Sequence, residues 1–175
     1  MDLVSRFQLA ERLGVTAKAM RTLINTGVVR ETITSGRNVY VTEAEADRLC
    51  SIEELTETPE PSLLVKVTEA KFEDSDGSSE ERAWTGWNPG IPADHKDQMD
   101  GVRMWWGVND PDRYVGHLLV PIAAGFVLAV YEVIGYRTGP AKLRAFDIKP
   151  ATDARAHPLV DHRFPTQRGS LTDPR

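Results

Sequence analysis

The chain has 175 residues, of which 41% are hydrophobic and 27% are charged, and its formal net charge is -5. This composition excludes a collagen-like, a disulfide-rich and a wholly disordered protein. No apolar run approaches the roughly eighteen residues of a membrane span, and Cys50 has no second cysteine to pair with. The N-terminus lacks the basic and apolar regions of a secretory signal, so we expect a cytoplasmic protein without a membrane partner.

Charge is distributed unevenly along the chain. Residues 1–50 hold seven basic and six acidic side chains, residues 51–100 hold four and thirteen, and residues 101–175 hold ten and seven. Segment 73–81 alone has five acidic residues and no lysine or arginine. We therefore expect a polyanion to bind the ends of the chain, and a protein partner to bind the acidic loop 73–81 or the β-rich second half.

Residues 1–50 contain the start and stop signals of three short helices and a hairpin. Apolar residues fall at helical spacing in two blocks separated by Gly14, and Thr16 stands where an N-cap residue is expected. Two β-branched runs around a glycine-containing turn indicate a hairpin, and Thr42 with Glu45 forms the pattern of a capping box. The expected elements are helices over 6–13, 17–25 and 42–50, and a hairpin over 28–41 with its turn at 35–38.

The order of these elements resembles the winged helix-turn-helix superfamily of MerR and phage-excisionase proteins. The residues that carry the resemblance are 8–24, a helix-turn-helix pattern, and 36–45, where Gly-Arg precedes a short apolar strand and a Thr-Glu-Ala helix start. The resemblance implies that helix 16–25 enters the DNA major groove and that the wing 30–41 contacts the backbone or the minor groove. No long dimerisation helix follows, so the excisionase-type monomers are the closer match.

The resemblance and the apolar periodicity together indicate which side chains would face DNA. Met20, Leu23 and Ile24 point inward on the second helix, which leaves Arg21 to bond a guanine edge. Arg37, at the wing tip, would reach the backbone or the minor groove. The candidate DNA-binding residues are Thr16, Ala17, Lys18, Arg21, Thr22, Arg30, Thr34, Arg37 and Asn38.

The rest of the chain has a different character. Residues 51–62 are acidic and end in a proline-rich stretch, which is typical of a linker. Residues 63–150 are expected to form a separate, mostly antiparallel β domain, and residues 151–175 an extended or disordered tail. Strands are expected at 63–67, 103–108, 126–136 and 143–148, with a short helix at 111–117. The expected fold class is α+β.

The β-rich part faintly resembles PUA-like barrels such as the ASCH and EVE modules. The resemblance rests on the tryptophan-bearing segment 103–109, a short helix with an arginine, and the apolar segment 126–131. It implies a small barrel or a curled sheet in which tryptophans stack a flipped base. The residues of this candidate ligand pocket are Trp84, Trp87, Trp105, Trp106, Arg113 and Tyr131. The alternative is that these aromatic residues pack in the core, which is their usual place in a small barrel.

Three functions are compatible with these features. The first is sequence-specific binding of double-stranded DNA by a small transcription regulator, excisionase-like or repressor-like, encoded by a phage or another mobile element. The second is a phage structural or adaptor protein whose winged helix docks a protein, and the third is a sensor of modified nucleotides. The sequence contains no catalytic triad signature, phosphate loop, dinucleotide fingerprint or zinc-ligand pattern, so we expect no enzymatic activity, cofactor or metal.

Overall fold

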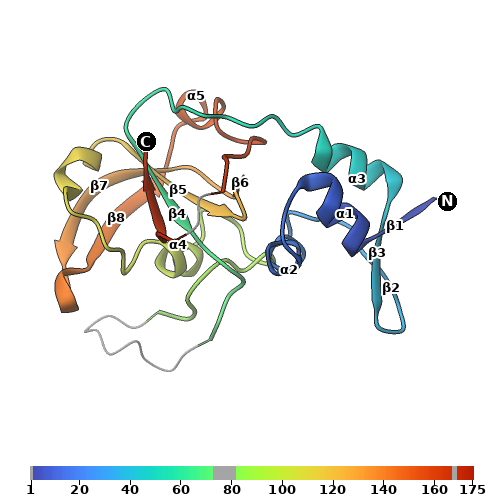
Figure 1. Ribbon diagram of the computed structural model, residues 1–175. Coiled ribbons are helices and arrows are strands. Elements are labelled where there is room, and N and C mark those ends of the chain that lie inside the picture. The colour runs from blue at the N-terminus through green and yellow to red at the C-terminus, as the bar shows by residue number, and fades with distance from the viewer. Residues whose placement is uncertain (1, 73–81, 167–168) are drawn as a thin grey trace.

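The computed structural model describes residues 2–72, 82–166 and 169–175. Its elements are arranged in two units that lie side by side, one formed by residues 2–50 and the other by the described residues from 62 onward (Figure 1). Both units combine helices with an open sheet, which confirms the α+β class. The expected acidic loop 73–81 lies outside the described residues.

Residues 2–50 form what we call the N-terminal unit. In chain order it consists of β1 (Leu3–Ser5), α1 (Arg6–Leu13), α2 (Ala17–Asn25), β2 (Ile33–Ser35), β3 (Asn38–Thr42) and α3 (Glu43–Cys50). The strands form an antiparallel sheet in the order β1-β3-β2. The expected helices are confirmed, and the hairpin is present with its turn where expected, but it is shorter than 28–41 because its first strand begins at Ile33. The sequence pattern does not predict β1, because three residues are too few to show a period. Membership of the winged helix-turn-helix superfamily stays a prediction.

Local hydrogen bonds produce the tight turn between α1 and α2. Gly14 takes the left-handed conformation, with φ of 67°, and its N–H donates to the carbonyls of Ala10 and Glu11. The Thr16 hydroxyl accepts from the N–H of Ala19 at 3.1 Å and so caps α2. Gly14 and Thr16 are the caps that the sequence predicts, and they allow the two helices to pack across a very short connection.

The second unit, which we call the β unit, is built on one open sheet. In chain order its described elements are β4 (Ser62–Lys66), α4 (Lys96–Val102), η1 (Pro111–Tyr114), β5 (Leu118–Ala123), β6 (Phe126–Val127), β7 (Tyr131–Thr138), η2 (Pro140–Lys142), β8 (Arg144–Pro150), α5 (Asp153–Ala156) and β9 (Thr172–Pro174). The strand order is β8-β7-β5-β4-β9, and β6 pairs with β5. Only the β4–β5 pair among these is parallel, so the mostly antiparallel sheet is confirmed. The described sheet does not close into a barrel, and the PUA-like resemblance stays a prediction.

Strand β5 lies in the middle of the sheet although its sequence argues against a central strand. Pro121 has no N–H to donate to a neighbouring strand, and proline is therefore confined to edges and irregular positions. β5 pairs with β7 only at Leu118 and Leu119 and with β6 only from Ile122 onward. Pro121 thus stands between the two antiparallel pairings, where β5 needs no donor on that side.

Three of the expected elements differ in the structure. The strand expected at 126–136 is divided into β6 and β7, which both run antiparallel to β5 but are separated at 128–130 by a shift of one residue in their register with β5. Segment 103–108 is not a strand: it follows α4 directly, and its ladder contact is a single bridge between Trp106 and Arg144. The helix expected at 111–117 is reduced to the 3-10 turn η1. The strands expected at 63–67 and 143–148 are confirmed as β4 and β8.

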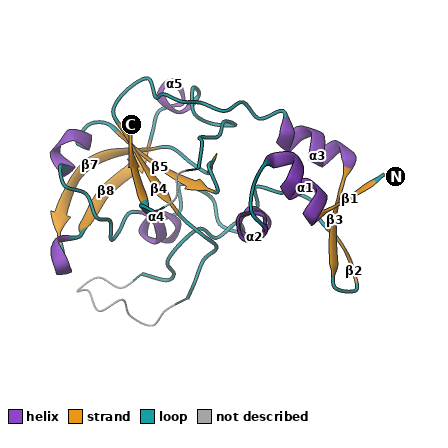
Figure 2. Cartoon of the chain, viewed as in Figure 1, coloured by secondary structure: helices purple, strands orange, loops and turns teal. Residues whose placement is uncertain are grey.

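The described residues of the C-terminal segment, 151–166 and 169–175, form an ordered part of the β unit, so the expected extended or disordered tail is wrong. Leu159 and Phe164 are completely buried in a cluster with residues of β4 and β5. β9 pairs antiparallel with β4, with Leu64 opposite Asp173. Figure 2 shows β9 beside β4 and α5 at the top of this unit. The apolar residues of the segment lie in turns, and this explains why the sequence shows no helical or strand periodicity there.

Phe126 joins the two units. The turn of Ala124 and Gly125, both with positive φ, connects β5 to β6 and presents Phe126 to the N-terminal unit. The Phe126 side chain is 2% exposed and belongs to the buried cluster that contains Leu9 and Leu49. The two units, which the sequence divides into separate domains, therefore share a core residue.

A second contact lies at the C-terminal end of α2. Gly27 has φ of 77°, and a Cβ atom built on it would stand 2.8 Å from the Cβ of Pro89 in the β unit. The glycine therefore serves both the helix end and the close approach of the two units.

Segment 51–61, expected to be a linker, is hydrogen-bonded to the C-terminal segment. The Leu55 N–H donates to the carbonyl of Arg163 at 2.7 Å. The Glu60 carboxylate accepts from Arg155 and lies 3.2 Å from Nδ1 of His117. The hydrogen bond from Arg155 holds the pKa of Glu60 below its usual range. These contacts attach the connection between the units to the β unit.

We expect Phe126→Ala to lower the free energy of unfolding by about 3–5 kcal/mol, as emptying a buried phenylalanine site does. Urea unfolding at neutral pH measures the change. The control is Phe7→Ala, whose side chain is 59% exposed, and it should cost less than about 1 kcal/mol. Equal losses in the two variants would contradict a core shared between the units.

The Glu60 cluster should make stability depend on pH. Because the folded-state pKa of Glu60 is lowered, the carboxylate stabilises the fold above its unfolded pKa, and this stabilisation is lost as the pH falls through the folded pKa. Glu60→Gln should therefore cost about 1 kcal/mol at pH 7, the value of a partly exposed charged hydrogen bond, and progressively less in acid. Urea unfolding at several pH values tests this, with Glu57→Gln, an exposed glutamate of the same segment, as control. If the difference in free energy of unfolding between wild type and Glu60→Gln were the same at every pH, the predicted pH dependence would be wrong.

Candidate nucleic-acid interface

The nine candidate DNA-binding residues lie at the surface of the N-terminal unit. They belong to α2, its N-cap and the hairpin with the segment leading into it, and all are exposed except Thr22, which is half-buried. Gly36 and Arg37 form the turn between β2 and β3, beyond the last pair of Ser35 and Asn38. The structure thus places Arg37 at the hairpin tip, as the sequence predicts.

The α2 residues are divided between two sides of the helix. Ala17 and Arg21 line a groove between α1, α2 and β3, which we call the α1–α2 groove. Thr16, Lys18 and Thr22 line another, between α2 and the β unit, which we call the α2–β5 groove. Side chains three residues apart diverge by about 60° around a helix, and this separates Lys18 from Arg21. One side of α2 is therefore turned to the β unit.

Most basic side chains of residues 2–50, a range that the structure describes in full, have no ion pair. The paired ones are Arg12, with Glu43 at 2.5 Å, and Arg48, with Glu45 at 2.7 Å. The cations of the unit without an ion pair are Arg6, Lys18, Arg21, Arg30 and Arg37. Four of these five lie on α2 or in the hairpin region that the sequence analysis selected, and Arg6 lies on α1, which it did not select.

Glu45 holds the base of the hairpin against α3. Its carboxylate accepts from the backbone N–H of Arg30 at 2.7 Å and from the Arg48 guanidinium, which also donates to the carbonyl of Val28. Burial raises the pKa of Glu45, but the hydrogen bonds from Arg48 and Arg30 outweigh it and hold this pKa below its usual range. The expected capping box is therefore only half formed: Thr42 caps the N–H of Glu45, while the Glu45 carboxylate is used elsewhere.

The tryptophans of the candidate ligand pocket lie mostly in the core. Trp84, Trp87 and Trp106 are buried and Trp105 is half-buried. Trp106 donates its indole N–H to the carbonyl of Val102 at 2.8 Å. Tyr131 is buried, donates to the carbonyl of Ala93 at 2.7 Å, and has its pKa raised by burial.

These residues are also not gathered around one cavity. Trp87 lines a cavity between the two units, Trp105 and Trp106 line a pocket beside α4, and the exposed Arg113 lines a third, next to β9. The described residues thus form no aromatic cage from the predicted set. The core alternative accounts for three of the four tryptophans.

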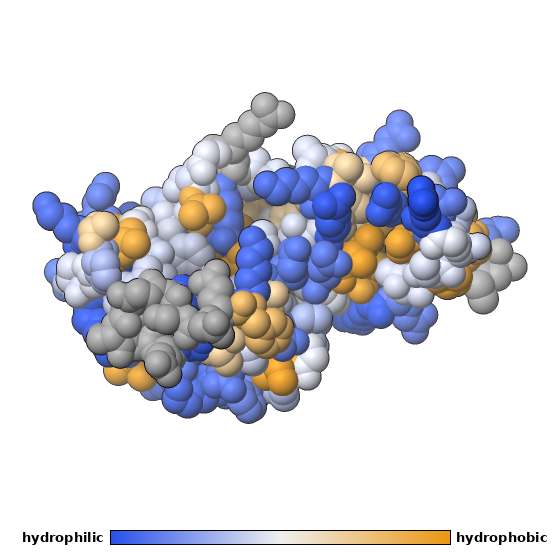
Figure 3. Space-filling view, turned by 90° about the horizontal axis from the view of Figure 1, so that it is seen from below, coloured by the Kyte–Doolittle hydropathy of each residue, from blue (hydrophilic) through white to orange (hydrophobic). Residues whose placement is uncertain are grey.

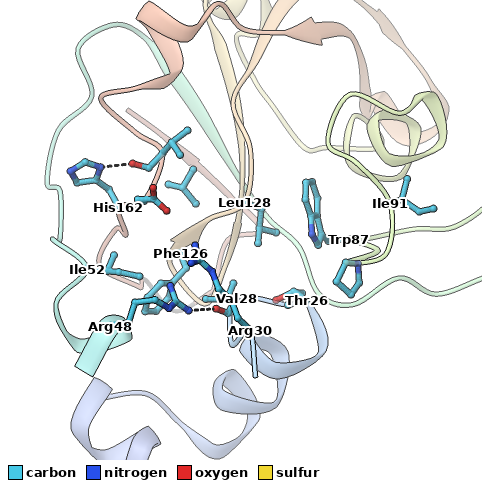
Figure 4. A pocket seen from close by; sticks show the side chains of 15 residues that line it. Thr26, Val28, Arg30, Arg48, Ile52, Trp87, Ile91, Phe126, Leu128 and His162 are labelled. Atoms are coloured by element: carbon cyan, nitrogen blue, oxygen red, sulfur yellow. Dashed lines mark hydrogen bonds between the residues drawn. The ribbon is translucent and has the colours of Figure 1, made fainter. Parts of the chain in front are cut away.

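A cavity with a volume of about 520 Å³ lies between the two units, close to the candidate interface. Figure 4 shows Arg48, Arg30, Val28 and Thr26 of the N-terminal unit and Trp87, Phe126 and Leu128 of the β unit around it, with Phe126 close to Arg48. Sequence reasoning missed this cavity, because its walls come from two units whose packing the sequence does not reveal. Its charges are mixed: Arg48 is already bonded to Glu45, and Asp161 also lines the wall.

Among the described residues, no group of three or more histidine, cysteine, aspartate or glutamate side chains is arranged to hold a metal ion. Within the same residues, no helix is long and apolar enough to cross a membrane. Comparison with known proteins found no matching family model, no matching curated protein and no matching solved structure.

The buried glutamate at the hairpin base should be more important for stability than its neighbour in the same helix turn. Glu45→Ala leaves the Arg30 N–H and the partly buried Arg48 without their acceptor, so it should cost about 2–3 kcal/mol. Glu43→Ala removes a carboxylate that is 42% exposed and should have a smaller effect. Urea unfolding of both variants tests the prediction, and a larger loss for Glu43→Ala would contradict it.

Proposed function

We propose that the N-terminal unit binds double-stranded DNA, with α2 in the major groove and the β2–β3 hairpin on the backbone or minor groove. The observation that carries the proposal is the set of five cations without ion pairs on α1, α2 and the hairpin. Phosphate contacts from such side chains supply most of the non-specific affinity of DNA-binding proteins. We propose a small regulator of the excisionase or repressor kind as the biological role.

Arg21 and Arg37 have different tasks in this proposal. Arg21 is exposed on α2, the helix proposed to enter the major groove, where an arginine can bond a guanine edge through two hydrogen bonds. Arg37 is exposed at the hairpin tip, from which a long side chain can reach phosphates. Lys18 lies on the side of α2 turned to the β unit, where it would meet the backbone flanking the groove.

The β unit has a steric role in the proposal. It is held next to α2 by Phe126 and by the close approach of Gly27 to Pro89. A duplex that receives α2 therefore also lies near the β unit, which restricts the angle of approach. The proposal assigns binding alone, and no catalytic role, to the β unit.

Arg21→Ala should weaken binding of the preferred sequence by about 1–3 kcal/mol, the usual value of a good base contact. The preferred sequence is obtained by selection from random duplex DNA, and fluorescence anisotropy measures the affinity. Arg21→Ala should also reduce the preference for that sequence over random duplexes, because a base contact is lost.

Arg37→Ala should lower the affinity for all duplexes by the same factor and reduce the slope of log affinity against log salt concentration by about one unit. Arg12→Ala is the matched control for both arginine variants, because Arg12 is paired with Glu43 and should not contribute to DNA binding. If neither Arg21→Ala nor Arg37→Ala differs from Arg12→Ala, the DNA-binding proposal is wrong.

A further inference from the structure

The α1–α2 groove has an apolar floor that a DNA-binding function does not use. Its apolar lining consists of Phe7, Ala17, Met20, Ile24 and Val39, and its volume is about 320 Å³. Phe7 is 59% exposed, although large apolar side chains are normally buried. The space-filling view from below shows hydrophobic residues gathered over this unit with hydrophilic residues around them (Figure 3).

Two cations stand at the rim of this floor. Arg6 and Arg21 line the groove, Asn25 completes its polar part, and none of the lining residues is acidic. The guanidinium of Arg6 lies 4.9 Å from the centroid of the Phe7 ring, so charge and apolar surface are in direct contact. Neither arginine has an ion pair in the described structure. The groove therefore requires an occupant that is both apolar and anionic.

Duplex DNA satisfies only half of this requirement. Phosphates and base edges pair with arginines, but apart from the thymine methyl group they offer nothing to fill an apolar groove. A protein segment with acidic residues around one or two apolar side chains satisfies both halves, because its carboxylates can bond the arginines while an aromatic or aliphatic side chain enters the groove.

We propose that the α1–α2 groove docks an acidic protein segment that carries apolar anchor residues. The anchor lies on Phe7, Met20 and Val39, and the carboxylates of the segment bond Arg6 and Arg21. Because Arg21 is also the proposed base contact, the segment and a duplex cannot use it at the same time. Docking of such a partner would therefore release DNA, and this adds a partner-controlled state to the proposed function.

The test uses the full chain and a library of random peptides of about 12 residues, long enough for an anchored segment, displayed on phage. Soluble Phe7→Ser protein is present in excess, so that peptides binding elsewhere are removed. Since Phe7 is 59% exposed, this variant should fold, and circular dichroism is used to check this. The surviving peptides should be enriched in aspartate and glutamate and should each contain an aromatic or large aliphatic residue.

One selected peptide is then synthesised with a fluorophore, and its affinity is measured by anisotropy. Phe7→Ser and Arg21→Glu should each weaken its binding at least about tenfold, because the first removes apolar surface that the peptide would bury and the second removes an ion-pair partner. Arg12→Ala should leave the affinity unchanged. An unlabelled duplex should displace the peptide.

Three results would overturn the proposal: no peptide survives the counter-selection, the survivors lack acidic residues, or Phe7→Ser weakens duplex binding while no peptide binds. The last result would assign the groove to DNA alone. Conversely, peptide binding with these variant effects in a protein that binds no duplex would support the docking groove and refute the DNA-binding function, so the two proposals can fail separately.

Discussion

The insertion of Phe126 into the N-terminal unit is the contact on which the arrangement of the whole molecule depends. A hydrophobic contact has no direction of its own, but here the rigid β5–β6 turn supplies one, since its two residues of positive φ fix how the side chain leaves the sheet. With Phe126 in place, the β unit cannot rotate about the connection at 51–61 without exposing a phenylalanine ring and opening the core around Leu9 and Leu49. Hydrogen bonds that join Leu55 and Glu60 of this connection to the C-terminal segment restrain it further.

This docking gives α2 two unequal sides. The side with Lys18 faces the β unit across the α2–β5 groove, and the side with Arg21 remains open together with Arg6 and Phe7. A helix that is free on all sides can be approached by a ligand from many angles. The Arg21 side and the hairpin beyond it face away from the β unit, so the proposed base contact and the proposed protein contact must compete for one surface. Such overlap is a simple physical basis for exclusive binding of two partners.

The sequence predicts local structure in the N-terminal unit well, because the signals there are local. Gly14 and Thr16 act within one turn of chain, and so they end and begin helices where the pattern indicates. The same pattern does not predict β1 or β9, since each consists of three residues whose strand conformation depends on a distant partner. The sequence does not indicate β5, because Pro121 argues against a central strand. Only the pairing of β6 and of β7 with β5 shows why a proline is tolerated there. The candidate site residues on α2 and the hairpin are exposed apart from Thr22, whereas the packing of the β unit beside Lys18 cannot be predicted from local sequence signals.

The pairing of β9 with β4 and the placement of Phe126 have a consequence for the order in which the chain can fold during synthesis. Residues 1–50 leave the ribosome with their core incomplete, because Phe126, which packs in it, lies far downstream. β4 follows with one edge uncovered until β9 has been made, although exposed strand edges favour association with other chains. Contacts of such long sequence separation slow folding and extend the time during which nascent chains can aggregate. The two units therefore complete their structures together, after β6 and β9 have been made, rather than one after the other.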